Sequence, residues 1–135
     1  MKSLVVDDEI ICRKIFEKVL SQYGSCDAVK NGNDAIEAYK TSLDNECPYQ
    51  LMVLDIVMPD LHGGQVLSLI RDIEKEKGVS ETDKLRVILT TATDTWFSRE
   101  FVTKKLNFIY EAYFVKSPDI NEFKDKIYDL GFVID

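Results

Sequence analysis

The sequence of 135 residues has no long apolar run and no basic cluster. Its apolar runs all fall short of the ~20 residues that a membrane helix needs, and Asp7 follows the apolar start of the chain too early for a signal peptide. No more than two Lys or Arg residues are adjacent, and the formal net charge of -7 repels both nucleic-acid phosphates and anionic membrane surfaces. We therefore expect a cytoplasmic protein that binds neither nucleic acid nor a membrane directly.

Cysteine and histidine are also scarce. The three cysteines, Cys12, Cys26 and Cys47, are odd in number and widely spaced, which fits neither a disulfide framework nor a paired set of zinc ligands. We interpret them as reduced thiols. A catalytic triad would have only His62 available, in a segment that contains Pro and Gly. We interpret His62 as a solvent-facing loop residue.

A chain of this length forms one domain with one sizeable core. Short apolar runs alternate with segments whose apolar residues repeat at helical spacing, a pattern typical of βαβ proteins. The predicted strands are residues 3–6, 26–29, 51–54, 86–90 and 112–115. Because parallel strands need crossover connections, the alternation predicts an α/β fold with a doubly wound, five-stranded parallel sheet and helices on both faces. A fourth helix rich in aromatic residues is expected between residues 93 and 110, with these residues in the core or, alternatively, on a partner surface.

Polar side chains follow four of the predicted strands. Asp7 and Asp8 come after the first, Asp55 after the third, Thr91 after the fourth and Lys116 after the fifth. Ligands of such a sheet bind beyond the carboxyl ends of the strands, so we expect these side chains to converge on one rim.

Three carboxylates held close together repel one another unless a cation neutralises them. Mg²⁺ suits this rim because it binds carboxylates, keeps waters and completes its shell with phosphate oxygens. Beside Mg²⁺, Asp55 has the chemistry to attack phosphorus and hold an acyl phosphate, with Lys116 and Thr91 binding the phosphoryl oxygens. Each residue alone also has a plainer interpretation: Asp7 and Asp8 as acids before a helix, and the other three as ordinary strand-end or loop residues.

Four segments resemble the receiver domain of bacterial two-component response regulators, in particular single-domain regulators of the chemotaxis type. They are residues 4–9, 54–63, 91–92 and 113–116, and the resemblance extends from residue 2 to about residue 130. It implies a flavodoxin-like strand order of 2-1-3-4-5, a receiver domain over residues 1–131 and a C-terminal tail of residues 132–135.

The resemblance also implies a function. Asp55 would accept a phosphoryl group from the phosphohistidine of a sensor histidine kinase or a histidine phosphotransfer protein. Mg²⁺ would be bound by Asp8, Asp55 and the backbone carbonyl of Val57, with Asp7 acting directly or through water. Beyond its own phosphoryl transfer and dephosphorylation, the chain would not be an enzyme.

The output of such a domain is a change of surface. In the family, the hydroxyl at the position of Thr91 moves toward the phosphoryl group, which Lys116 also binds, and an aromatic ring, here Tyr113, rotates inward. This movement would alter the face formed by the fourth helix, the fifth strand and the fifth helix, where a downstream protein or a second copy of the chain would bind.

The sequence departs from the family pattern after Lys116. Ser117 precedes Pro118, where the family usually has proline directly after the lysine, and a cis Lys116-Ser117 bond would cost about 3 kcal/mol. Val57 and Thr93 occupy positions that influence how fast water attacks the acyl phosphate. Because valine does not hydrogen-bond a water, we predict slow self-dephosphorylation.

Two other functions remain open at this point. One is a receiver-like binding module that works without phosphorylation. The other is a phosphohydrolase with an aspartate nucleophile, although such enzymes carry a second acid two residues after the first, and here that residue is Val57.

Overall fold

The computed structural model describes residues 1–58, 60–92, 110–116 and 119–134. Its elements, in chain order, are β1 (Lys2–Val6), α1 (Ile10–Leu20), β2 (Ser25–Val29), α2 (Gly32–Asp44), β3 (Leu51–Asp55), α3 (Gly63–Lys77), β4 (Arg86–Thr91), β5 (Ala112–Val115) and α5 (Ile120–Asp129). The five strands form one sheet in the order β2-β1-β3-β4-β5, and all neighbouring pairs are parallel. The predicted fold class and strand order are confirmed. The segment of the expected fourth helix, residues 93–109, lies outside the described residues.

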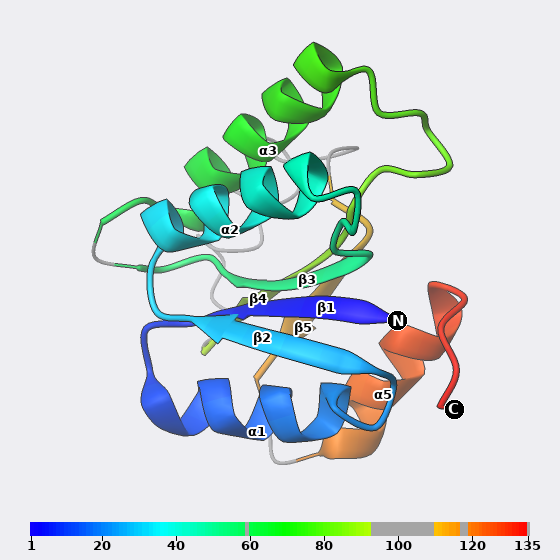
Figure 1. Ribbon diagram of the computed structural model, residues 1–135. Helices are drawn as coiled ribbons and strands as arrows, with labels where there is room; N and C mark the ends of the chain where they lie inside the picture. The colour runs from blue at the N-terminus through cyan, green and yellow to red at the C-terminus, as the bar shows by residue number, and fades with distance from the viewer. Residues whose placement is uncertain (59, 93–109, 117–118, 135) are drawn as a thin grey trace.

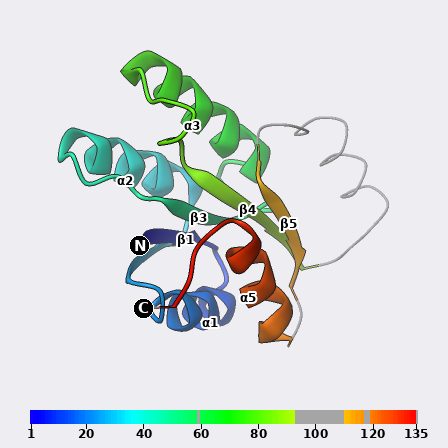
Figure 2. The same cartoon turned by 90° about the vertical axis from the view of Figure 1, so that its right-hand side faces the viewer.

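The sheet forms the middle of three layers. Helices α2 and α3 cover one face and α1 and α5 cover the other (Figure 1 and Figure 2). Successive residues of a strand point to opposite faces, so β1 contributes Leu4 and Val6 to the core under α2 and α3, and Val5 to the core under α1 and α5. Strands covered on both sides need continuous apolar runs, which explains why residues 51–54 of β3 are all buried.

The first turn of α2 is tied to the segment that follows β3. The Asp60 carboxylate accepts hydrogen bonds from the backbone N–H groups of Gly32 (3.1 Å) and Asn33 (3.0 Å), and Asn31 Oδ1 accepts one from Asp34 (2.8 Å). These bonds satisfy donors that have no partner within the helix. They also tie the loop between β3 and α3 to the start of α2.

The loop leads into His62, which is the N-cap of α3 and not the solvent-facing loop residue expected from the sequence. Its Nδ1 accepts from the Gly64 N–H (3.1 Å), and Gln65 Oε1 accepts from the His62 N–H (2.9 Å). Burial lowers the pKa of His62, which favours the neutral ring that Nδ1 needs in order to accept. The end of the β3–α3 loop nearest α3 is therefore held by the contacts of Asp60 with α2 and by the N-cap of α3.

The three cysteines are free thiols, as expected, and Cys47 is exposed. Among the described helices, none combines the length and the apolar character that crossing a bilayer requires.

Candidate functional site

An acidic cluster occupies the rim where β1 and β3 end. A carboxylate oxygen of each of Asp7, Asp8 and Asp55 lies within 4.8 Å of the other two. Asp7 and Asp55 are 1% and 5% exposed, whereas Asp8 is exposed. The apolar runs of β1 and β3 thus place two carboxylates in a nearly dry environment and leave the third open to solvent.

Lys116, the residue after β5, reaches into this cluster. Its Nζ lies 2.8 Å from Asp7 Oδ2 and 3.3 Å from Asp55 Oδ2. The backbone N–H of Lys116 donates to the carbonyl of Thr91 at 2.8 Å, which continues the β4–β5 pairing by one residue. The structure therefore brings together four of the predicted site residues, Asp7, Asp8, Asp55 and Lys116.

Burial and charge oppose each other at this site. Burial raises the pKa of Asp55 to about 6; the nearby Lys116 lowers it in part and the Asp7 carboxylate raises it further. Burial alone would lower the pKa of Lys116, but the carboxylates of Asp7 and Asp55 outweigh burial and raise it. Lys116 is thus held as a cation, and Asp55 ionises fully only near neutral pH.

The turn that carries Asp7 and Asp8 is held by three hydrogen bonds. Asp7 Oδ1 accepts from the Glu9 N–H at 2.9 Å, the Asp7 carbonyl accepts from Arg13 Nη1 at 2.9 Å, and the Asp7 N–H donates to the Val29 carbonyl at 3.2 Å. The N-cap of α1 is Glu9, and its side chain makes no capping bond. The Asp8 carboxylate therefore does not serve as the cap of α1. The bond from Arg13 was not predicted from the sequence. Arg13 lies six residues after Asp7, and no motif in the sequence links the two positions.

Two contacts fix the backbone around Asp55. The Val57 N–H donates to Asp55 Oδ1 at 3.2 Å, while the Val57 side chain is 65% exposed. Gly63 packs against the end of β3, where a Cβ atom would lie 2.5 Å from the Asp55 carbonyl oxygen and 2.7 Å from the Ile56 Cα. Only glycine fits there without displacing the strand end that carries Asp55.

Thr91 and Tyr113 lie on the neighbouring strands β4 and β5, where Tyr113 pairs with Leu89, two residues before Thr91. Thr91 is the last residue of β4 and is 3% exposed. Tyr113 in β5 packs against the core under α2 and α3, and its hydroxyl is buried. Three further positions singled out by the sequence, Thr93, Ser117 and Pro118, lie outside the described residues.

The donor set of the cluster fits a hard divalent cation. Its ligands are oxygen atoms, two of them on buried carboxylates, and Lys116 is the cation that the described residues place among them. Mg²⁺ prefers such a set of one or two carboxylates with open positions for water and phosphate oxygens. These observations are consistent with Asp7, Asp8 and Asp55 as metal ligands.

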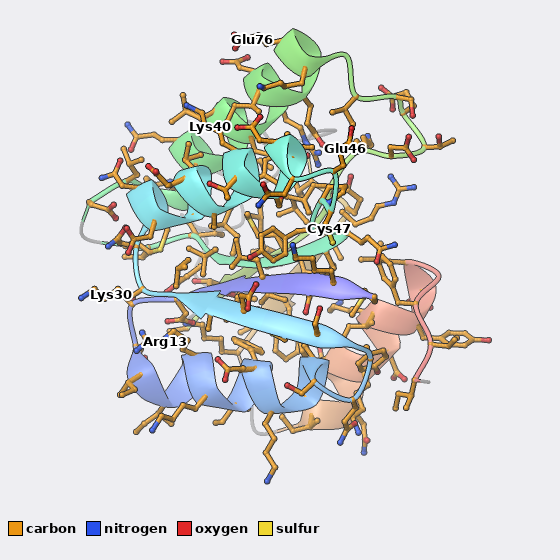
Figure 3. All side chains as sticks on the ribbon, in the orientation of Figure 1. Arg13, Lys30, Lys40, Glu46, Cys47 and Glu76 are labelled. Atoms are coloured by element: carbon orange, nitrogen blue, oxygen red, sulfur yellow. The ribbon has the colours of Figure 1, made fainter. Side chains whose placement is uncertain are left out.

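A hollow of about 750 Å³ lies at the opposite edge of the sheet, lined in part by Lys2, Tyr49 and Arg86. Figure 3 shows the two edges: Arg13 and Lys30 lie where β1 and β2 end, and Glu46 and Cys47 lie across the sheet from them. None of the acidic cluster lines this hollow.

Comparison with known proteins gives one family. A family model described as response regulator receiver domain matches residues 3–128. Hybrid signal transduction histidine kinase L of Dictyostelium discoideum is 38% identical over 92 residues, which are 67% of this chain and 5% of that protein. Two-component response regulator ORR22 of Oryza sativa is 36% identical over 72 residues, which are 52% of this chain and 10% of that protein. The chain thus spans a tenth or less of the length of these two curated relatives.

Solved structures agree with these matches. The response regulator TrrA of Thermotoga maritima, crystallised in complex with Mg²⁺-BeF, has a TM-score of 0.71 and 28% identity, with 96% of this chain and 97% of that chain covered. The receiver domain of Ssk1 of Saccharomyces cerevisiae, crystallised with the histidine phosphotransfer protein Ypd1, has a TM-score of 0.78 and 24% identity, with 97% of this chain and 88% of that chain covered. At that identity the yeast likeness shows the fold alone.

Proposed function

The chain belongs to the response regulator receiver domain family, the receivers of two-component phosphorelays, and from this premise we propose that Asp55 accepts a phosphoryl group from a phosphohistidine. The donor is a sensor histidine kinase or a histidine phosphotransfer protein. The observation that carries the proposal is the cluster of Asp7, Asp8 and Asp55 with Lys116 held between two of them. This arrangement supplies a buried acceptor, a cation and room for a metal at one point.

The proposed transfer is a substitution at phosphorus. A carboxylate oxygen of Asp55 forms the new P–O bond, the P–N bond to the donor histidine breaks, and its electron pair leaves with the imidazole ring. The product is an acyl phosphate on Asp55. Because the acceptor must be ionised, the pKa of about 6 for Asp55 favours transfer at neutral pH and above.

The other residues hold charge in place. When bound, Mg²⁺ neutralises negative charge on the carboxylates and the phosphoryl oxygens. We assign its ligands to Asp8, Asp55 and the Val57 carbonyl, with Asp7 binding directly or through water. The proximity of the three carboxylates and the exposed position of Asp8 support the carboxylate part of this assignment.

Lys116 and Thr91 contact the phosphoryl group in this proposal. Lys116 turns its ammonium from the Asp55 carboxylate to a phosphoryl oxygen, and the Thr91 hydroxyl donates to another. As the Thr91 hydroxyl moves toward the phosphoryl group, the Tyr113 ring rotates inward. This rotation alters the face that includes β5 and α5. A downstream protein, or a second copy of the chain, reads that face.

The phosphohistidine donor docks on α1 beside the acidic cluster. Ile10, Ile11 and Ile15 are 54%, 65% and 45% exposed, although α1 has its own buried stripe of Phe16, Val19 and Leu20. Exposed apolar side chains beside a reactive group favour a protein partner. We place this exchange in the cytoplasm.

The receiver domain occupies residues 1–131, and residues 132–135 form a tail.

The acyl phosphate decays slowly, because Val57 presents an apolar side chain where a hydrogen-bonding residue would hold the attacking water. Thr93 is the second position that sets this rate.

The test is the intact mass of the protein after incubation with acetyl phosphate and Mg²⁺. We expect one added phosphoryl group, and none in an Asp55→Asn variant or in a chelated sample. If acetyl phosphate and a phosphohistidine donor both fail to label the folded protein, the proposal is wrong. The receiver fold would then serve as a binding module that works without phosphorylation.

A further inference from the structure

Thr90 is a polar residue in an apolar part of the sheet. Its side chain is fully buried, and its hydroxyl has no hydrogen-bond partner among the described residues. The neighbouring residues of β4, Val87, Ile88 and Leu89, are buried apolar side chains. Valine has the same shape as threonine, and a buried hydroxyl without a partner costs stability. The stability of the resting fold therefore does not explain why threonine stands here.

The position of Thr90 relates it to the site. The parallel register pairs Thr90 with Asp55 across β3 and β4, and with Phe114 across β4 and β5. By strand alternation, Thr90 shares a face with Ile88, which packs in the core under α1 and α5. Asp55 points to the same face, two residues after Val53 of that core. Because neighbouring strands are about 4.8 Å apart, Thr90 is the β4 neighbour of the acceptor on this face.

Lys116 passes over the same place. It starts at the end of β5 and reaches Asp55 on β3 and Asp7 beyond β1, so its side chain crosses β4 on the face that carries Thr90. In the resting structure the Lys116 ammonium donates to Asp55 Oδ2. When Lys116 turns to a phosphoryl oxygen, as proposed above, the Asp55 carboxyl group loses this donor. The Thr90 hydroxyl, on the neighbouring strand, is then a donor for which the described residues supply no other partner.

We propose that Thr90 is a positioning residue for Asp55, whose hydroxyl donates to the Asp55 carboxyl group when Lys116 turns to the phosphoryl group. The inference rests on the proposed function of Asp55. The Thr90 hydroxyl would make its hydrogen bond only in the phosphorylated protein. This explains why the described residues give it no partner in the unphosphorylated structure. A hydroxyl without a partner at rest adds binding energy only as the reaction proceeds, so its effect falls on the rate.

The test compares Thr90→Val, which keeps the shape and removes the hydroxyl, with Thr90→Ser, which keeps the hydroxyl. With acetyl phosphate and saturating Mg²⁺, we expect Thr90→Val to be phosphorylated about five-fold more slowly than wild type, the equivalent of one hydrogen bond of about 1 kcal/mol. Thr90→Ser is expected to recover most of that rate. The unfolding midpoint of Thr90→Val is expected to be no lower than that of wild type.

Ser3→Ala is the matched control, since it removes a buried hydroxyl from the other end of the sheet, where the Ser3 hydroxyl donates to the Ser25 carbonyl at 3.4 Å. Its phosphorylation rate is expected to equal that of wild type. Equal rates for Thr90→Val and wild type would overturn the inference, as would Thr90→Ser being as slow as Thr90→Val. If wild type itself accepts no phosphoryl group from acetyl phosphate or a phosphohistidine donor, it is the proposed function that fails, and the inference fails with it.

Discussion

At the scale of single residues, the fold disfavours the ionised form of the Asp55 carboxyl group. The carboxyl group is almost fully buried, and burial raises its pKa to about 6, although Lys116 partly offsets this effect. Between the ordinary pKa and the raised one, the folded protein binds a proton that the unfolded chain releases. Residues selected for reaction often reduce stability in this way.

Replacing Asp55 with Asn is expected to stabilise the Mg²⁺-free protein at about pH 7.5, by roughly 1–3 kcal/mol. The pKa is 3.8 ordinarily and about 6 in the fold, so the contribution of the protonated carboxyl is fully present below about pH 4 and is lost as the pH rises through 6. The gain from Asp55→Asn should therefore shrink toward zero below about pH 4.

Urea unfolding of both proteins at the two pH values measures this difference. Asp72→Asn, which changes an exposed acid on α3, serves as the control for removing one negative charge, and is expected to leave the free energy of unfolding within about 0.5 kcal/mol of wild type. An Asp55→Asn variant less stable than wild type at about pH 7.5 would contradict the account of the buried charge.

Mg²⁺ is expected to raise the unfolding temperature of wild type, because a cation that binds only the folded state adds about 2.7 kcal/mol at 100 times its Kd. Asp8→Asn is expected to fold as well as wild type in the presence of a chelator, since Asp8 is exposed, and to lose the stabilisation by Mg²⁺. Thermal unfolding with Mg²⁺ or chelator measures both effects. Glu9→Gln, the neighbouring exposed acid outside the cluster, should keep the shift; an equal shift in Asp8→Asn would remove Asp8 from the ligand set.

At the scale of elements, α1 has two apolar faces with different uses. Phe16, Val19 and Leu20 pack against the sheet, where Phe16 lies 4.8 Å from Phe123 of α5 between ring centroids. Ile11 and Ile15 point away from that core and toward solvent. An amphipathic helix in a globular protein has one apolar stripe, so the second one is available for a partner.

The double variant Ile11→Ala/Ile15→Ala is expected to raise the KM for a phosphohistidine donor about ten-fold, because truncating two interface residues typically costs 1–2 kcal/mol. Labelling by acetyl phosphate, which needs no docking surface, is expected to stay unchanged. Steady-state transfer assays with both donors measure the two effects. Leu69→Ala, an exposed leucine on α3 across the sheet, is the control; a donor KM unchanged in the α1 double variant would place the docking surface elsewhere.

At the scale of the whole molecule, parallel strands explain why much of the site was predictable. Each apolar run ends at the same rim, so the residue after each run has a known place before any coordinates exist. Asp7, Asp55 and Lys116 meet for this reason. The strand boundaries were predictable to within one residue because buried parallel strands are continuous apolar runs with polar ends.

Other contacts depend on the approach of separate segments, and the sequence has no periodic signal for them. The bonds from Gly32 and Asn33 to Asp60 are of this kind. Both join the Asp60 carboxylate to backbone groups whose distance from it is set by how the segments pack. The cap formed by His62 and the bond from Arg13 to the Asp7 carbonyl are local, but neither follows from the apolar periodicity that predicts the helices. The Thr90 hydroxyl, which has no partner within the described part of the chain, is a further case, since a threonine in a β-strand is ordinary until its burial and its partners are known.

The most direct test of the central claim identifies the phosphorylated atom. Borohydride reduces an acyl phosphate on aspartate to homoserine, so wild-type protein incubated with a phosphohistidine donor and Mg²⁺, reduced and digested, reports the acceptor by peptide mass. Homoserine at position 55, absent without donor and absent from Asp55→Asn, is the result that this account predicts. Reduction at another carboxylate, or label that survives in Asp55→Asn, would contradict it.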